Sequence, residues 1–164
     1  MESFAELRAA VIARLSAERR LENCRVLGAF PPQARETPLR KPVIAVGFDA
    51  LHLTGSLGGL LTAGQEHDLY GMPCVLTMRF DIFVPVPTAV ETLGGYELLE
   101  CLWESLLPGG NPFGFTEFAS TPMVWDAVCE ANRLTAKGKL HMALTRRSED
   151  TPMRDIRLVA PGAV

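Results

Sequence analysis

The sequence lacks the cysteine spacing of a metal site or a redox motif. Its four cysteines stand far apart, and none forms a C-x-x-C pair or has a histidine at ligand spacing: Cys24, Cys74, Cys101 and Cys129. A secretory leader is also missing, because charges interrupt the stretch where its apolar core would lie: Glu2, Glu6, Arg8 and Arg14. We therefore expect reduced, mostly buried thiols in a protein of the cytoplasm.

No membrane-spanning segment is predicted. The longest uncharged stretch, Ala50–Gln65, has 16 residues, four of them glycine, whereas a spanning helix needs about 20 apolar residues. The chain has 164 residues, of which 48% are hydrophobic and 21% charged. Both values are typical of one globular domain, so we expect a single soluble domain over residues 1–164 and no membrane partner.

Motifs for catalysis or cofactor binding are scarce. The glycine-rich TGSLGG at 54–59 has no G-x-x-x-x-G-K-[ST] pattern, and no lysine occurs between Lys41 and Lys137. Ser56 lacks the first glycine of a nucleophile elbow, since Thr54 stands there. The three histidines are too scattered for a metal signature: His52, His67 and His141. We therefore expect no catalytic residues, no cofactor, no metal and no enzymatic activity.

Basic residues are rare in the middle of the chain. Residues 51–132 contain ten acidic groups and one basic group, Arg79, whereas residues 133–164 contain seven basic and three acidic groups. The fold could mix these blocks or segregate them. Segregation into an acidic and a basic face would favour contacts between copies. The few basic groups lack interleaved aromatics, which disfavours a nucleic-acid partner.

The first half of the chain predicts one helix, a connector and one strand. Ser3 and Glu6 form a capping box, so a helix should begin there and fade near residues 20–23. Residues 28–42 hold four prolines and predict an extended loop. Val43–Phe48 predicts a short strand. For residues 49–73, rich in glycine, a hairpin and a flexible loop both remain open.

Cys74–Val84 predicts one long, half-buried strand. Every second residue from Cys74 is apolar, and the alternate set contains all the polar residues of the run. Arg79 and Asp81 should therefore be neighbours on one face, with Phe83 exposed beside them. They form either an ion pair within the chain or a contact to another copy.

The second half predicts another helix and further strands. Thr88 and Glu91 form a capping box for a helix that Pro108 and the glycines after it terminate. Strands are predicted over residues 113–120, 123–128, 134–144 and 154–159, before a frayed tail at 160–164. The expected fold is α+β, with a mixed, mainly antiparallel sheet packed against two main helices. Four basic residues of the last strands are candidate protein contacts: Lys137, Lys139, Arg146 and Arg147.

The order of these elements resembles that of the tail terminators, or tail-completion proteins, of long-tailed phages and related particles. The phrases that carry the resemblance are PLRKPVIAVGF (38–48) and VLTMRFDIFVP (75–85). It implies a late structural protein that forms a ring, a hexamer in that family, on the completed tail tube. Its implied partners are itself, the tube protein and the head connector or neck. Its implied location is the host cytoplasm during assembly and then the head-proximal end of the virion tail.

Two other interpretations remain open from the sequence. One is another head–tail connector or tail-completion component of the same assembly. The other is a small-molecule-binding domain or an uncharacterised enzyme, which would need a concave pocket with converging polar groups.

Overall fold

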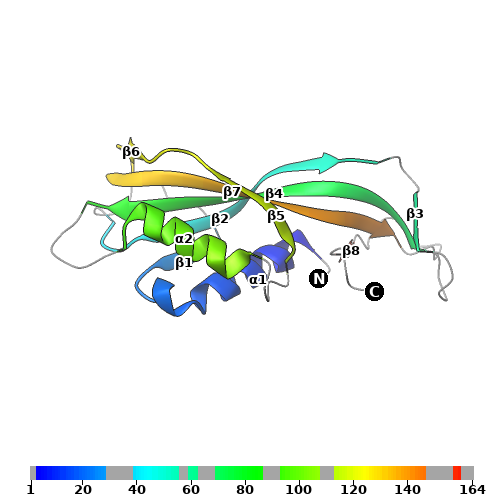
Figure 1. Cartoon of the computed structure of the whole chain (residues 1–164), viewed down its shortest axis with the longest axis horizontal. Coiled ribbons are helices and arrows are strands. Elements are labelled where there is room, and N and C mark those ends of the chain that lie inside the picture. The colour runs from blue at the N-terminus through cyan, green and yellow to red at the C-terminus, as the bar shows by residue number, and fades with distance from the viewer. Residues whose placement is uncertain are drawn as a thin grey trace.

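Two helices cover one face of a long β-sheet in the computed structural model of the chain (Figure 1). The structure describes residues 3–28, 39–55, 59–62, 69–86, 93–107, 113–146 and 157–159. One strand pair is parallel and the others are antiparallel. The predicted α+β class, with a mixed, mainly antiparallel sheet against two main helices, is therefore confirmed.

The first helix begins where the sequence predicts. Helix α1 spans Phe4–Ser16, and the Oγ of Ser3 accepts a hydrogen bond from the backbone N–H of Glu6 at 3.2 Å. This bond satisfies one of the free N–H groups at the helix start. The apolar stripe at helical spacing is buried: Leu7, Val11 and Leu15.

The helix ends earlier than predicted, at Ser16, and a short 3₁₀ helix, η1 (Arg19–Leu21), follows. Strand β1 (Arg25–Leu27) then pairs in parallel with the start of strand β2 (Val43–Leu53). A strand of three residues is too short to leave a periodic signal in the sequence. Most of the predicted proline-rich loop, residues 29–38, lies outside the described residues.

The open question at residues 49–73 is answered by a hairpin. Strand β2 continues to Leu53, strand β3 spans Gly59–Thr62, and strand β4 spans Leu69–Pro85. Both β2 and β3 pair with β4 in antiparallel register. The long strand predicted from Cys74 therefore begins five residues earlier.

Pro73 lies inside β4 because one partner strand is interrupted there. The carbonyl oxygen of Pro73 accepts a hydrogen bond from the backbone N–H of Thr54 at 2.9 Å. In an antiparallel ladder the N and O of one residue point to the same side. The N–H that proline lacks would therefore point to the side where β2 has just ended, and the ladder with the other neighbour stays intact.

The second helix begins later than predicted. Helix α2 spans Gly95–Leu106, and Leu93 and Gly94 are not helical. The predicted capping pair, Thr88 and Glu91, lies outside the described residues. Instead, the Glu97 side chain accepts a hydrogen bond from the backbone N–H of Gly94 at 2.7 Å. The weak helix formers at 94–95 thus mark the helix start.

The remaining strands surround β7 (Ala131–Arg146), which pairs with β4 along sixteen residues. On its other side β7 pairs with β5 (Phe115–Ser120), β6 (Val124–Asp126) and β8 (Arg157–Val159). The order across the sheet is β1-β2-β4-β7-β5. All four strands predicted after the second helix are present, with shifted ends. The predicted frayed tail, 160–164, lies outside the described residues.

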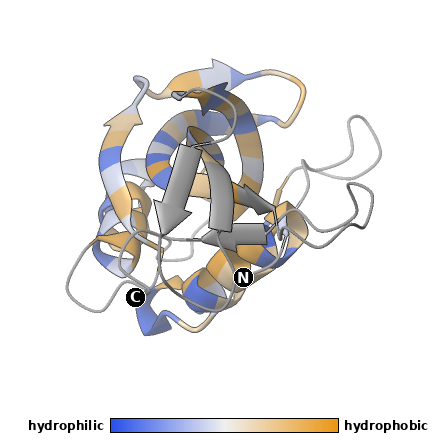
Figure 2. Cartoon of the chain, turned by 90° about the vertical axis from the view of Figure 1, so that its right-hand side faces the viewer, coloured by the Kyte–Doolittle hydropathy of each residue, from blue (hydrophilic) through white to orange (hydrophobic). Residues whose placement is uncertain are grey.

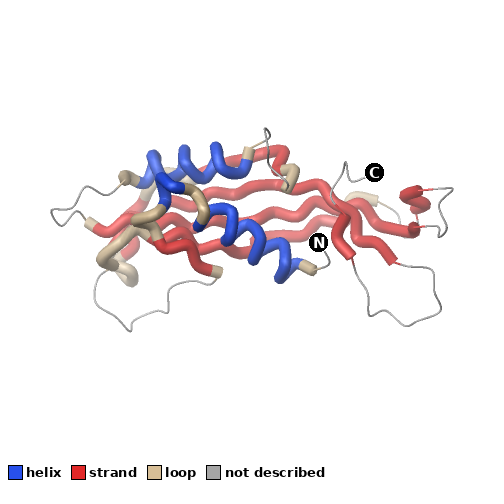
Figure 3. Tube along the Cα trace, turned by 90° about the horizontal axis from the view of Figure 1, so that it is seen from below, coloured by secondary structure: helices blue, strands red, loops and turns tan. Residues whose placement is uncertain are grey.

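Both helices pack on the same face of the sheet, which we call the helix face (Figure 3). Figure 2 shows hydrophobic and hydrophilic residues interspersed along the strands. Successive side chains of a strand point to opposite faces of the sheet, so one strand can contribute to both faces. The helix face contributes Leu76, Met78, Phe80 and Ile82 of β4 and Leu134, Ala136 and Leu140 of β7 to the main core. Burial of one such large apolar side chain stabilises the fold by about 1.5–3 kcal/mol.

Candidate contact surface on the second face of the sheet

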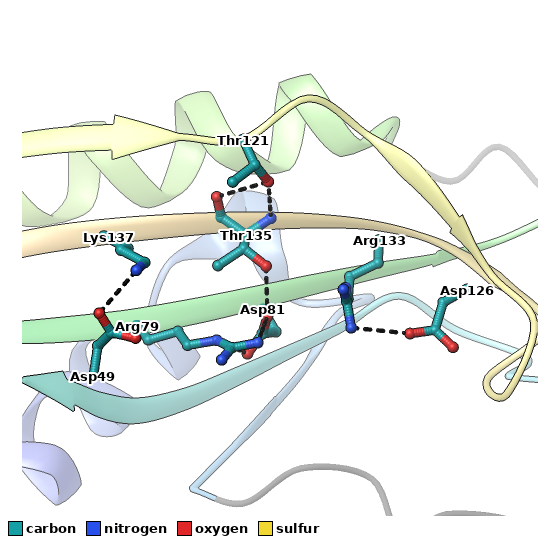
Figure 4. Close-up of polar contacts among 8 residues, drawn as sticks. All are labelled: Asp49, Arg79, Asp81, Thr121, Asp126, Arg133, Thr135 and Lys137. Atoms are coloured by element: carbon teal, nitrogen blue, oxygen red, sulfur yellow. Dashed lines mark hydrogen bonds and ion pairs between the residues drawn. The ribbon is translucent and has the colours of Figure 1, made fainter.

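The side of the sheet away from the helices, here the second face, carries the polar residues of β4 and β7. Asp81 lies directly opposite Thr135 in the ladder, and the Thr135 hydroxyl donates to Asp81 Oδ1 at 2.7 Å. Arg79 lies on the same face and places its Nε 2.7 Å from Asp81 Oδ2. The backbone of Thr135 also bonds to Thr121 (Figure 4). This network joins β4, β7 and the connection that follows β5.

Asp81 and Phe83 are buried, which corrects the prediction that they form an exposed surface beside Arg79. The relative exposure is 2% for Asp81 and 0% for Phe83. Phe83 belongs to a second, smaller core with Val43, Ala45 and Ala131, packed under Leu27, Leu39 and Cys129. Asp81 is covered by its polar neighbours. In this fold neither side chain is accessible to another protein.

Arg79 remains partly accessible. Its side chain is 35% exposed, against 3% for the side chain of Asp81. The ion pair within the chain is therefore present, as one of the two interpretations proposed. The hydrogen bond from the guanidinium to Asp81 raises the pKa of Arg79 above its usual value, so the charge persists at any relevant pH.

The two candidate lysines of β7 pair with acidic residues of other strands, Lys137 across β4 with β2 and Lys139 with the adjacent β5. Lys137 Nζ lies 2.8 Å from Asp49 Oδ2, and Lys139 Nζ lies 2.6 Å from Glu117 Oε2. Each lysine side chain is close to half exposed. The hydrogen bond from Lys139 lowers the pKa of the exposed Glu117 carboxyl.

A third pair completes the pattern: Arg133 Nη1 lies 3.1 Å from Asp126 Oδ2 (Figure 4). In each of the three pairs, a basic residue of β7 meets an acidic residue from the middle or first part of the chain. The uneven charge distribution left open whether the fold mixes or segregates the acidic and basic parts of the sequence. On this face the fold mixes them.

The other two candidates cannot be placed. Arg146 is the last residue of β7, opposite Tyr70 of β4, and its side chain lies outside the described part of the chain. Arg147 lies outside it altogether.

The sequence did not indicate the exposed apolar residues at two edges of the sheet. On β2, the exposed fractions are 37% for Phe48, 41% for Leu51 and 55% for Leu53. At β6 and the turn after it, they are 50% for Val124, 54% for Trp125 and 60% for Val128. The sequence signal that could have revealed these residues is local composition. Both segments are apolar, yet they lie next to glycine, proline or turn residues, which are typical of the protein surface.

The described residues offer little for catalysis. No group of three histidine, cysteine or acidic side chains among them could hold a metal ion. All four cysteines are free thiols, and burial raises the pKa of Cys24 to about 12, so its nucleophilic thiolate is scarce. No helix in the described ranges is long and apolar enough to cross a membrane. Neither the comparison with protein families nor that with curated proteins gave a match.

Proposed function

We propose that this chain is a non-enzymatic structural subunit that closes the head-proximal end of a phage tail tube as a ring of identical copies. The proposal combines the resemblance to tail terminators with one observation. A row of paired charges, each at least a quarter exposed, crosses the second face from β2 to β5: Asp49, Arg79, Lys137, Lys139 and Glu117. Such a row provides fixed polar groups for a protein contact and no arranged nucleophile or base.

Exposed charge pairs such as these contribute more to the selection of a protein partner than to the strength of binding. An exposed ion pair contributes about 0–1 kcal/mol to stability, so these pairs do little to hold the subunit together. Charges held in fixed positions instead select an oppositely patterned partner and steer its approach. In the proposed assembly the partners are the tube protein on one side and the head connector or neck on the other.

A tube-capping assay tests the proposal. The tail tube protein encoded by the same genome is polymerised with and without this chain, and tube lengths are measured by electron microscopy. We expect shorter tubes with extra density at one end. The double charge reversal Lys137→Glu/Lys139→Glu should abolish capping. The control reversal Glu22→Lys, at an exposed residue directly after η1, should leave capping intact. Unchanged tube lengths with the wild-type chain would refute the proposal.

Gene deletion distinguishes a tail terminator from another connector or tail-completion component of the same assembly. Loss of a terminator should give overlong or headless tails, whereas loss of a tube initiator should give no tails. A genome without tail genes near this one would remove the basis for both interpretations.

A further inference from the structure

Strand β2 has an unpaired outer edge among the described residues. Its neighbour β1 covers only Val43, Ile44 and Ala45, and no described strand pairs with the outer side of β2 beyond them. The segment Val46–Leu53 is therefore an edge strand of eight residues. Such an edge is a template for pairing with another chain.

The backbone groups on this edge can be assigned by alternation. Arg25 N–H donates to Pro42 O at 2.9 Å, so residues 44, 46 and 48 direct their backbone groups outward. The bulge at Asp49 shifts this alternation. Thr54 N–H donates to Pro73 O, toward β4, so Leu53 and Leu51 direct theirs outward. The outward positions after Val46 thus coincide with the exposed side chains of Phe48, Leu51 and Leu53.

The opposite edge of the sheet is formed by β5 and β6. Across the ladder, Leu51 pairs with Leu76, Leu76 with Leu140, and Leu140 with Phe115 of β5. The two edges therefore lie at the same level along the strands. Strand β5 runs antiparallel to β7, and β7 runs in the direction of β2. The β2 of a second copy in the same orientation would meet β5 as an antiparallel partner, without any inversion or shift.

Charge favours the same arrangement. Residues 24–28 and 39–45, at the β1–β2 edge, hold three basic groups and no acidic group: Arg25, Arg40 and Lys41. Residues 113–130, at the β5–β6 edge, hold three acidic groups and no basic group: Glu117, Asp126 and Glu130. Of these, Glu117 and Asp126 are paired with Lys139 and Arg133 of β7. In an unshifted contact, β6 and its exposed Trp125 would lie level with β1 of the next copy. Two copies of the same edge would repel each other because they carry the same charge, whereas the two different edges attract each other.

We propose that the outer edge of β2, residues 46–53, binds the β5–β6 edge of a second copy of this chain, continuing the sheet from subunit to subunit. The contact joins two different surfaces, so it generates a closed ring or an open chain and not a two-fold dimer. It specifies the self-contact of the ring in the function proposed above, on which its biological meaning rests.

Two variants block one edge each. Leu51→Lys/Leu53→Lys places charges on the β2 edge, where both side chains are exposed. Ser120→Pro acts on β5: Thr121 N–H donates to Thr135 O, so the N–H of Ser120 points away from β7 and its loss spares the internal ladder. Val86→Lys, an exposed apolar residue beyond the end of β4, is the matched control. Circular dichroism confirms folding, and Ser120→Lys replaces the proline variant if that variant unfolds.

Sedimentation velocity over a concentration series gives the readout. We expect the wild type and Val86→Lys to form oligomers, and each edge variant alone to associate at least tenfold more weakly. A 1:1 mixture of the two edge variants should give dimers, because one intact edge of each kind remains. A monomeric wild type at its highest soluble concentration, an edge variant that still dimerises alone, or a mixture that stays monomeric would overturn the proposal.

The outcome is separable from that of the capping assay. Edge-dependent oligomers that leave tube length unchanged would keep this contact and refute the terminator function. Capped tubes formed equally by both edge variants would keep the function and refute this contact.

Discussion

Replacing Arg79 by methionine should destabilise the folded chain mainly because it leaves the buried Asp81 carboxylate without its ion-pair partner. Asp81 is 2% exposed, and its remaining hydrogen-bond donor in the network is the Thr135 hydroxyl. Removing one partner of a fully buried ion pair costs about 3–5 kcal/mol, since the other charge stays buried without compensation. The side chain of Arg79 is 35% exposed, so water can replace part of its contribution. We expect a loss of about 2–4 kcal/mol.

Two further variants, Asp81→Asn and the double variant Arg79→Met/Asp81→Asn, test whether the buried carboxylate causes the loss of stability. Asp81→Asn removes the buried charge, keeps an acceptor for Thr135 and frees Arg79 toward water, so it should cost only about 1 kcal/mol. The double variant Arg79→Met/Asp81→Asn should then be more stable than Arg79→Met alone, because no uncompensated carboxylate remains. This ordering is the opposite of simple additivity.

Urea unfolding at neutral pH, followed by circular dichroism, measures all three free energies of unfolding. A double variant less stable than Arg79→Met would refute the argument that the buried carboxylate is the main cost. A loss below about 1 kcal/mol for Arg79→Met would show that the pair behaves as an ordinary surface ion pair.

Three other predictions concern the core and the thiols. Phe80→Ala should cost about 3–5 kcal/mol in urea unfolding, because Phe80 is fully buried. Gly138→Ala should also destabilise, since its Cβ would lie 2.7 Å from Phe118 Cε1 and 2.8 Å from Phe115 Cδ1; an unchanged midpoint would mean the rings move freely. With a pKa of about 12, Cys24 is a thiolate in about one molecule in ten thousand at pH 8, so iodoacetamide should label it far more slowly in the native protein than in denaturant; equal rates would contradict the burial.

The sequence predicted the helix face of the sheet well, because one apolar residue in every two leaves an unambiguous pattern. Cys74, Leu76, Met78, Phe80 and Ile82 are all buried, as that pattern requires. The same pattern could not show which polar positions of the other set would be covered. Burial on that face depends on residues distant in sequence: Thr135 bonds to Asp81, and Leu39 and Cys129 pack against the second core, which contains Phe83.

A signal for the second core was nevertheless present in β2. Val43, Ile44, Ala45 and Val46 are four consecutive apolar residues, and all four are buried. A continuous apolar run indicates a strand that is buried on both faces, whereas an alternating run indicates one solvated face. Since Val43 lies opposite Phe83 in the ladder, burial of Phe83 follows from burial of Val43 on the same face.

The strand ends were harder to predict than the strands themselves. The glycine-rich stretch 49–73 and the alternation from Cys74 predicted that the strand begins at Cys74, whereas β4 begins at Leu69 and contains Gly71 and Pro73. The structure tolerates Pro73 because β2 ends at Leu53, so no described strand is present to accept the hydrogen bond that Pro73 could not make. Local sequence does not contain this information, since it depends on where a partner strand stops.

The bulge at Asp49 links the two surfaces proposed for assembly. Without an extra residue, Leu51 and Leu53 would follow Phe48 on the opposite face of the sheet, because side chains alternate strictly along a strand. With it, Phe48 lies opposite Met78, and Leu51 and Leu53 lie opposite Leu76 and Cys74, so the apolar edge stays on the helix face. The inserted residue itself reaches Lys137 on the second face. One irregularity in β2 thus places a charge in the polar row on the second face and an apolar edge beside it, so the two contacts proposed above use different parts of one sheet.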